Sequence, residues 1–188
     1  MDGNATIIAA NKLLAAMRKE DGTLRTYDEM KAEGIETKYL GRYETNTTPG
    51  LCRLDPNTGI GDPTPAFTYC LNLAEVEVDT KTGKTTVLKF TCVDFVGRIG
   101  NIDAVNGQAY SGIMHGIGFA LKEDYADVKK HANMFGAGTS YIKDVPDDID
   151  LIHIDGAISD GPFGSSGASE AFQASGHCAV LNGIYNAC

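Results

Sequence analysis

Apolar residues recur at helical spacing near the start of the chain and predict a helix over residues 4–19, for which Asn4 is a candidate N-cap. The apolar positions are Ile7, Ile8, Leu13, Leu14 and Met17. A second, short helix is indicated by Thr26-Tyr27-Asp28-Glu29, which has the capping-box pattern, and Gly34 would end it. Residues 35–43 suit a strand.

Alternation of apolar and polar residues is clearest in two segments, 68–79 and 85–95. They are separated by Thr80-Lys81-Thr82-Gly83-Lys84, in which a glycine is available for a turn. This pattern predicts a β-hairpin. The stretch before it, residues 44–65, is polar and rich in proline and glycine, which indicates a long loop.

Residues 107–125 follow a helical pattern that contains many small residues. The small residues are Gly107, Ser111, Gly112, Gly116 and Gly118. Each glycine costs a helix about 1 kcal/mol relative to alanine, so we expect close packing against backbone or a ligand. After irregular structure over 126–149, the pattern predicts a strand over 150–155, a glycine-serine loop over 161–170 and a last helix from residue 171.

Helices and strands follow one another without a βαβ rhythm, so the sequence predicts the α+β class, with helices packed on a mixed β-sheet. We expect one domain over residues 1–188. Both ends run directly into helical patterns without a cap or a polar exit, which suggests a segment cut from a longer polypeptide.

Composition excludes several classes of function. The chain has 188 residues, of which 43% are hydrophobic and 22% charged, with a net charge of -9 and no basic run for a nucleic-acid backbone. Neither a membrane span nor a secretion signal is apparent. The five cysteines are widely spaced without a C-x-x-C pair, so we expect reduced thiols in a cytoplasmic protein and no zinc or iron–sulfur site.

Glu170 is the first candidate for chemistry, because this carboxylate follows the small, flexible stretch Gly161-Pro-Phe-Gly-Ser-Ser-Gly-Ala-Ser. Near a helix start it would be ionised at neutral pH and usable as a general base. Acids are also common in first helical turns, and on spacing alone a capping role is the stronger interpretation.

Gln108 is the second candidate, because it lies at the expected head of the glycine-rich helix. A helix N-terminus with small neighbours can hold an anion or an oxo group, and glutamine can donate to it. A solvated capping residue is an equally good interpretation.

Other motifs are weaker. Ser166 lies in Gly164-Ser-Ser-Gly-Ala168, where the serine-hydrolase pattern requires a final glycine, and His177 has no obvious acid partner. Gly116-Ile-Gly118 lacks the third glycine of a dinucleotide site. The remaining histidines, His115, His131 and His153, are dispersed and lack a matching carboxylate, which argues against a metal site.

Taken in order, the helix NGQAYSGIMHGIGFALKEDY and the loop GPFGSSGASEAF resemble the molybdenum hydroxylases, the xanthine oxidase family, and in particular its bacterial aldehyde oxidoreductases. The hairpin segments and residues 129–155 are similar to the stretches around that helix in the family. The resemblance covers essentially the whole chain and implies the C-terminal part of the molybdopterin-binding region of a larger enzyme.

The resemblance implies roles for individual residues. Glu170 would be the catalytic base that deprotonates a molybdenum-bound hydroxyl, which then attacks an aldehyde carbon, and hydride passes to a sulfido ligand. Gln108, Ser169, Gly167 and Asn4 would contact the cofactor. Ser169 stands where the family commonly has glycine. No side chain would bind the metal, because the pterin dithiolene holds it.

The same resemblance implies molybdopterin, in its cytosine dinucleotide form, with molybdenum. It places the [2Fe-2S] clusters in an N-terminal part outside this sequence and implies a homo-oligomeric full-length enzyme acting on a small aldehyde. We expect the isolated 188 residues to be inactive. A serine hydrolase using Ser166 and a non-catalytic structural or assembly module are the alternatives.

Overall fold

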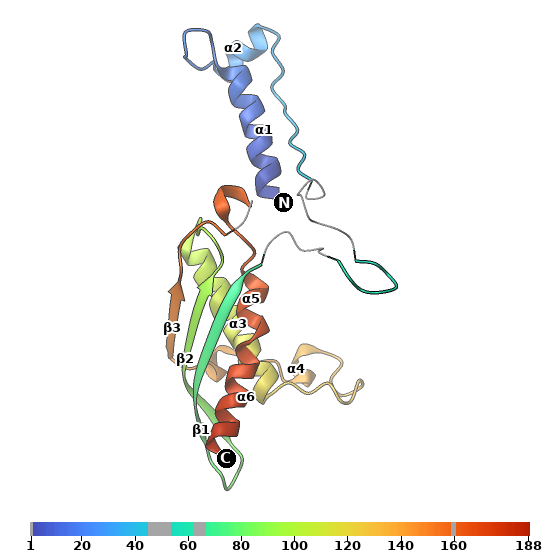
Figure 1. Ribbon diagram of the computed structural model, residues 1–188, viewed down its shortest axis with the longest axis vertical. Coiled ribbons are helices and arrows are strands. Elements are labelled where there is room, and N and C mark those ends of the chain that lie inside the picture. The colour runs from blue at the N-terminus through green and yellow to red at the C-terminus, as the bar shows by residue number, and fades with distance from the viewer. Residues whose placement is uncertain (1, 45–53, 62–66, 159–160) are drawn as a thin grey trace. The chain divides into compact units, whose positions relative to one another are not determined.

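The computed structural model describes residues 2–44, 54–61, 67–158 and 161–188 (Figure 1). The chain divides into two compact units. The first unit comprises Met1–Ala66 with Ser159–Phe163, and the second comprises Phe67–Ile158 with Gly164–Cys188.

The first unit contains two helices, α1 (Asp2–Met17) and α2 (Tyr27–Ala32). The predicted N-cap Asn4 is wrong, because α1 begins at Asp2 and Asn4 lies within its first turn. The predicted capping box of α2 is confirmed: the Glu29 N–H donates to Thr26 Oγ1, and the Thr26 N–H donates to the Glu29 carboxylate. Gly34, at φ 68°, ends this helix as expected.

The strand predicted over residues 35–43 is absent, and this part of the chain forms no regular element. It contacts α1 instead of a neighbouring strand. The Lys12 Nζ donates to the Leu40 carbonyl over 2.9 Å, and a Cβ built on Gly41 would lie 1.8 Å from the Ala5 carbonyl oxygen. Glycine therefore lets the segment approach the helix backbone directly. Of the expected loop over 44–65, residues 45–53 and 62–66 lie outside the described residues.

The second unit is built on a three-stranded sheet in the order β1-β2-β3. The predicted hairpin is confirmed: β1 (Tyr69–Val78) and β2 (Thr85–Phe95) pair antiparallel, and Gly83 in the turn has φ 75°. β3 (Asp148–His153) begins two residues before the predicted strand and pairs parallel with β2. The sheet is therefore mixed, as the sequence predicted.

A β-bulge in β2 adjusts which side chains face the core. Glu75 pairs with Lys89, but Val76 pairs with Val87, so Leu88 is an extra residue in β2. Because side chains alternate between faces, one extra residue changes the alternation from there on. Val87 and Phe90 therefore both lie on the buried face, although they are three residues apart.

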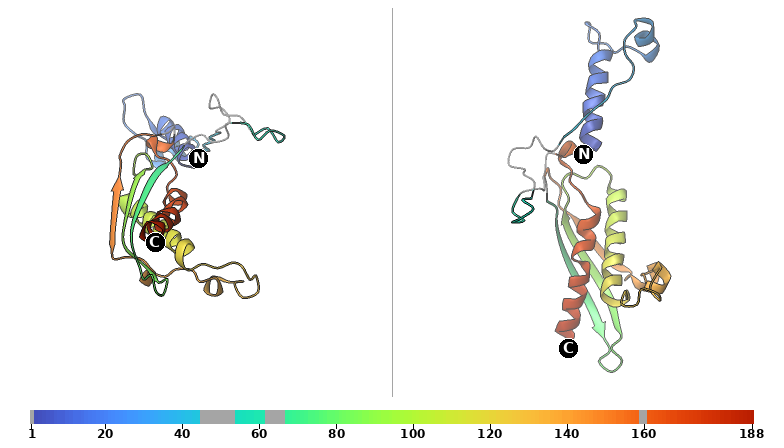
Figure 2. Two further views of the ribbon diagram at one scale, coloured as in Figure 1. Left: turned by 60° about the horizontal axis from the view of Figure 1, so that its bottom comes forward. Right: turned by 90° about the vertical axis from the view of Figure 1, so that its right-hand side faces the viewer.

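Three helices cover one face of this sheet, namely α3 (Ile102–Leu121), α5 (Ser169–Ala174) and α6 (Gly176–Ala187) (Figures 1 and 2). α3 begins five residues before the predicted start, because Asn101 caps it by accepting the Ala104 N–H over 3.0 Å. The predicted single last helix is two helices interrupted at Ser175.

Between α3 and β3 the chain is mainly irregular, as predicted. Two short turns interrupt it, the helix α4 (Met134–Ala137) and the 3-10 turn η2 (Ile142–Asp144). A second 3-10 turn, η3 (Pro162–Gly164), precedes α5. Gly138, at φ 80°, ends α4.

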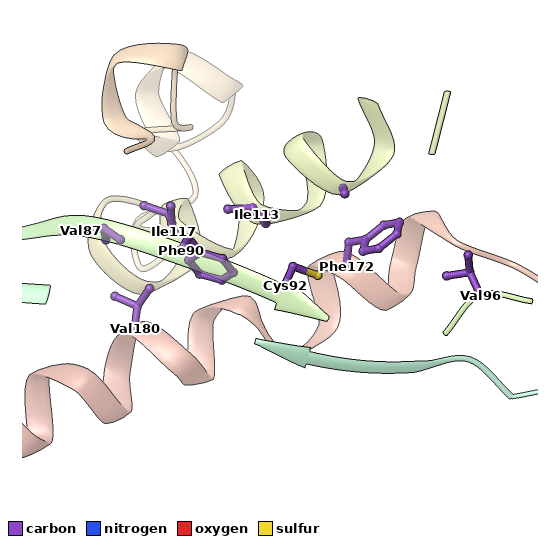
Figure 3. Close-up of a cluster of buried hydrophobic side chains, with 9 residues drawn as sticks. Val87, Phe90, Cys92, Val96, Ile113, Ile117, Phe172 and Val180 are labelled. Atoms are coloured by element: carbon purple, nitrogen blue, oxygen red, sulfur yellow. The ribbon is translucent and has the colours of Figure 1, made fainter. Parts of the chain in front are cut away.

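The core of the second unit lies between the sheet and these helices (Figure 3). Phe90 and Cys92 of β2 point toward Ile113 and Ile117 of α3 and toward Phe172 of α5, and all five side chains are buried. The full buried cluster comprises Val87, Phe90, Cys92, Val96, Ala109, Ile113, Ile117, Phe172 and Val180. Burial of this apolar cluster drives the assembly of the unit.

Two glycines of α3 allow it to approach the C-terminal helices closely. A Cβ built on Gly112 would lie 2.6 Å from the Phe172 Cβ, and one on Gly116 would lie 3.0 Å from the Gly176 Cα. A Cβ on Gly107 would meet nothing within 4 Å. The expectation that this helix packs against backbone is thus confirmed for Gly112 and Gly116, but Gly107 has a different environment.

Candidate functional site

Gln108 and Ser169, which are 61 residues apart in the sequence, meet in the structure. The Ser169 hydroxyl donates a hydrogen bond to Gln108 Oε1. Gln108 lies in the second turn of α3, not at its head as predicted, and Ser169 is the first residue of α5. The serine that directly precedes Glu170 therefore contacts the candidate glutamine.

Glu170 follows directly in α5 and is exposed. Two residues on, Phe172 is fully buried and anchors the same short helix in the core. Within the part of the chain that the structure describes, no cation forms an ion pair with the Glu170 carboxylate. The candidate base is thus held on an anchored helix beside the Gln108–Ser169 pair, with its carboxylate accessible.

The loop that leads to Glu170 is fixed by backbone contacts. The Ser166 N–H donates to the Val96 carbonyl over 2.9 Å, and the Thr68 hydroxyl donates to the Gly167 carbonyl over 2.7 Å. A Cβ on Gly97 would lie 2.4 Å from the Gly164 carbonyl oxygen, so glycine is required for this approach. The loop is therefore attached at the end of β2 and the start of β1.

Two further residues predicted to contact the cofactor, Gly167 and Asn4, lie in different structural environments. A Cβ built on Gly167 would meet nothing within 4 Å, so this side of the loop is open. Asn4 belongs to the first unit, where it lies in α1. Both stay predictions as cofactor contacts.

The serine-hydrolase alternative finds no catalytic arrangement in the described residues. Ser166 Oγ lies 3.3 Å from the Thr68 hydroxyl, and no histidine contacts it there. His177 Nε2 lies 3.4 Å from Cys178 Sγ instead. A serine nucleophile needs a base within hydrogen-bond reach.

The structure contains a buried polar cluster that the sequence did not predict. His153, at the end of β3, contacts Asp94 of β2 and Asn106 of α3. The expectation that His153 lacks a matching carboxylate is therefore wrong. Asp94 lies 59 residues earlier in the sequence, but the pairing of β2 with β3 places it beside His153. The available signal was an aspartate, Asp94, at strand spacing from the apolar residues Phe90 and Cys92.

The cysteines of the described residues are free thiols, as predicted. Cys70 Sγ and Cys92 Sγ lie 3.5 Å apart, within hydrogen-bond distance for sulfur, and form no disulfide. Cys52 lies outside the described residues. Across residues 2–44, 54–61, 67–158 and 161–188, no three histidine, cysteine or acidic side chains gather where they could hold a metal ion, and no helix is long and apolar enough to cross a bilayer.

The donor groups around Glu170 fit a large polar cofactor. Because Gln108 Oε1 accepts from Ser169, the Gln108 Nε2 group can point its two N–H donors outward. Gln108, Ser169 and Glu170 are all exposed, and Gly167 adds no side chain beside them. The site thus offers donors, a carboxylate and room, but no set of metal ligands.

Comparison with known proteins gives a consistent result. Residues 1–146 match the family model described as a molybdopterin cofactor-binding domain. The chain is 42% identical over 187 residues to an aldehyde oxidoreductase of Megalodesulfovibrio gigas, covering 100% of this chain and 20% of that protein. It therefore spans about one fifth of the length of this relative.

Solved structures agree. The aldehyde oxidoreductase of Desulfovibrio gigas superposes with a TM-score of 0.91 at 42% identity, over 98% of this chain and 20% of that one. That of Desulfovibrio desulfuricans gives a TM-score of 0.89 at 45% identity, over 100% of this chain and 20% of that one. The α+β prediction and the family resemblance are thereby confirmed, and the chain belongs to the molybdenum hydroxylase family, within its molybdopterin cofactor-binding domain.

Proposed function

We propose that this chain contributes the catalytic base, Glu170, to a molybdenum-dependent oxidation of an aldehyde to a carboxylic acid. The observation that carries the proposal is the meeting of Gln108 and Ser169 immediately beside an exposed, anchored Glu170. The similarity to aldehyde oxidoreductases over the full length of the chain supports this class of reaction.

In this proposal some residues bind the cofactor and one residue, Glu170, accepts a proton. Gln108 donates through Nε2 to polar oxygens of the cofactor, and the open loop at Gly167 lets it approach. Bound molybdopterin, in its cytosine dinucleotide form, supplies the metal that accepts two electrons from the substrate.

Glu170 accepts, on a carboxylate oxygen, the proton lost by the hydroxyl that attacks the aldehyde carbon. A positioned general base contributes about 10² to 10⁴-fold to a rate. The Ser169–Gln108 hydrogen bond joins the first turn of α5 to α3, so the carboxylate starts from a fixed backbone position. The iron–sulfur clusters that would carry electrons onward belong to a further part of the enzyme.

We expect Glu170→Gln, in the complete protein that carries these residues, to lower kcat by about 10² to 10⁴-fold, because glutamine cannot accept the proton. Molybdenum content and the circular dichroism spectrum should stay as in the unaltered protein, since the side chain is exposed and similar in shape. Steady-state kinetics with a small aldehyde measures the effect. The matched control is Glu77→Gln, an exposed glutamate of β1. Turnover near that of the control would refute the assignment of the base.

We further expect the 188 residues, produced alone, to contain far less than one molybdenum per chain and to show no turnover. The reason is that they correspond to one fifth of the length of the aldehyde oxidoreductases they match. Elemental analysis of the purified chain measures the metal. A stoichiometric content would mean that these residues hold the cofactor by themselves.

A further inference from the structure

A buried polar cluster joins the sheet to α3 near the proposed site. His153 Nδ1 lies 2.6 Å from Asp94 Oδ2, and His153 Nε2 lies 2.7 Å from Asn106 Oδ1. The Asp94 side chain is 0% exposed and that of His153 is 10% exposed. Asp94 and His153 are also paired neighbours in the parallel register of β2 and β3.

Burying these polar side chains costs free energy that apolar side chains in the same places would not cost. Burial raises the pKa of Asp94, and the hydrogen bond from His153 opposes that shift. Asp94 Oδ1 is buried and has no hydrogen-bond partner among the described residues. A buried polar contact seldom stabilises a fold more than an apolar pair of similar size, and in some proteins it selects one geometry. The arrangement therefore favours a role in positioning a neighbouring part of the chain.

The placed element is the N-terminal part of α3. His153 Nδ1 lies within hydrogen-bond distance of Asp94 Oδ2, and His153 Nε2 lies within hydrogen-bond distance of Asn106 Oδ1, so the ring bridges the sheet and α3. Asn106 lies two residues before Gln108 on the same helix. Residues two apart on a helix point in nearly opposite directions, and accordingly Asn106 is half-buried while Gln108 is exposed.

We propose that His153 is a positioning residue for the cofactor site: by holding Asn106 against Asp94, it fixes the first two turns of α3 so that Gln108 meets Ser169 beside Glu170. His153 acts through the helix backbone and touches neither substrate nor cofactor. This inference rests on the proposed function for its effect on turnover, but not for its effect on the helix.

The primary test is amide hydrogen exchange in the complete protein. A lost hydrogen bond of ordinary strength changes an equilibrium about five- to tenfold. We expect His153→Gln to speed exchange of the amides of residues 104–108 by about that factor, and to leave residues 113–120 of the same helix unchanged. His131→Gln, which alters a partly buried histidine of the loop after α3, is the matched control.

A second variant tests whether the effect passes through Asn106. Asn106→Ala removes only a half-buried amide, so the protein should remain folded. We expect it to reproduce the exchange pattern of His153→Gln, and the double variant to be no worse than either single one, because both break the same contact. Additive effects, faster exchange along all of α3, or no change at residues 104–108 would overturn the inference.

Steady-state kinetics of the same variants distinguish this inference from the proposed function. With the loaded protein we expect both variants to lower kcat about five- to tenfold, with an unchanged KM for the aldehyde. If Glu170→Gln keeps full turnover, the proposed base is wrong, and the exchange pattern still decides the role of His153. If Glu170→Gln is inactive but exchange is unaffected in His153→Gln, only the positioning role fails.

Discussion

Gly112→Ala is expected to destabilise the second unit by up to about 2 kcal/mol, although alanine is the better helix former. The new methyl group would lie 2.6 Å from the Phe172 Cβ and 2.9 Å from the Gln173 backbone nitrogen. Backbone cannot move aside as a flexible side chain can, so α3 and α5 must separate. Overpacking of this kind costs about 1–3 kcal/mol, against a gain of about 1 kcal/mol in helix propensity.

The matched control is Gly107→Ala, in the same helix. A Cβ at Gly107 meets nothing within 4 Å, so only the gain in propensity remains, and this variant should be more stable by up to about 1 kcal/mol. Urea denaturation of both variants, followed by circular dichroism, gives the comparison. Equal shifts in the same direction would show that α3 and α5 are not packed this closely in solution.

Phe90→Ala is expected to cost about 3–5 kcal/mol, the range for removal of a buried phenylalanine from a well-packed core. Phe90 is 0% exposed and lies at the centre of the buried cluster between β2 and the helices (Figure 3). Its neighbours come from several elements, so none of them can fill the cavity alone. A loss of this size approaches the whole stability of a small domain.

Phe135→Ala makes the same truncation where the ring is 84% exposed, in α4. Surface substitutions of this kind stay within about 0.5 kcal/mol. The two midpoints of chemical denaturation, measured side by side, isolate the effect of burial. A Phe90→Ala midpoint close to that of Phe135→Ala would show that the cluster does not form as described.

Local patterns in the sequence were enough to predict much of the second unit. The alternation on either side of Gly83 led to the hairpin, and the small residues of α3 led to its close packing, because both signals depend on near neighbours in the chain. The capping box at Thr26 was predictable for the same reason. Such features are decided within a few residues of one another.

Features that depend on distant residues could not be predicted in this way. The segment 35–43 has the composition of a strand, yet Gly41 and Leu40 contact α1 instead. The start of α3 was misplaced because Asn101, a capping residue, lies before the glycine-rich pattern rather than within it. The Asp94–His153–Asn106 cluster joins two strands and a helix, and no spacing along the chain reveals it.

The candidate site was predictable only through resemblance to the family. Spacing alone favoured a capping role for Glu170 and gave Gln108 even odds. Nothing in the local sequence indicated that Ser169 would contact Gln108, because the two residues belong to different helices. The family resemblance named the residues, and tertiary structure brought the two helices together.

The covering of β1 by α6 determines when this part of the protein can fold during synthesis. α6 lies against the hairpin, and the Asn72 side chain of β1 donates to Ser175 Oγ, which is encoded 103 residues later. A two-stranded hairpin is at best marginally stable by itself. At about 5–20 residues per second, the ribosome needs roughly 5 to 20 s to complete the interval between β2 and the end of α6. Until α6 emerges, the part of the apolar face on β1 lacks its cover, although α3, which is made earlier, can already pack on β2.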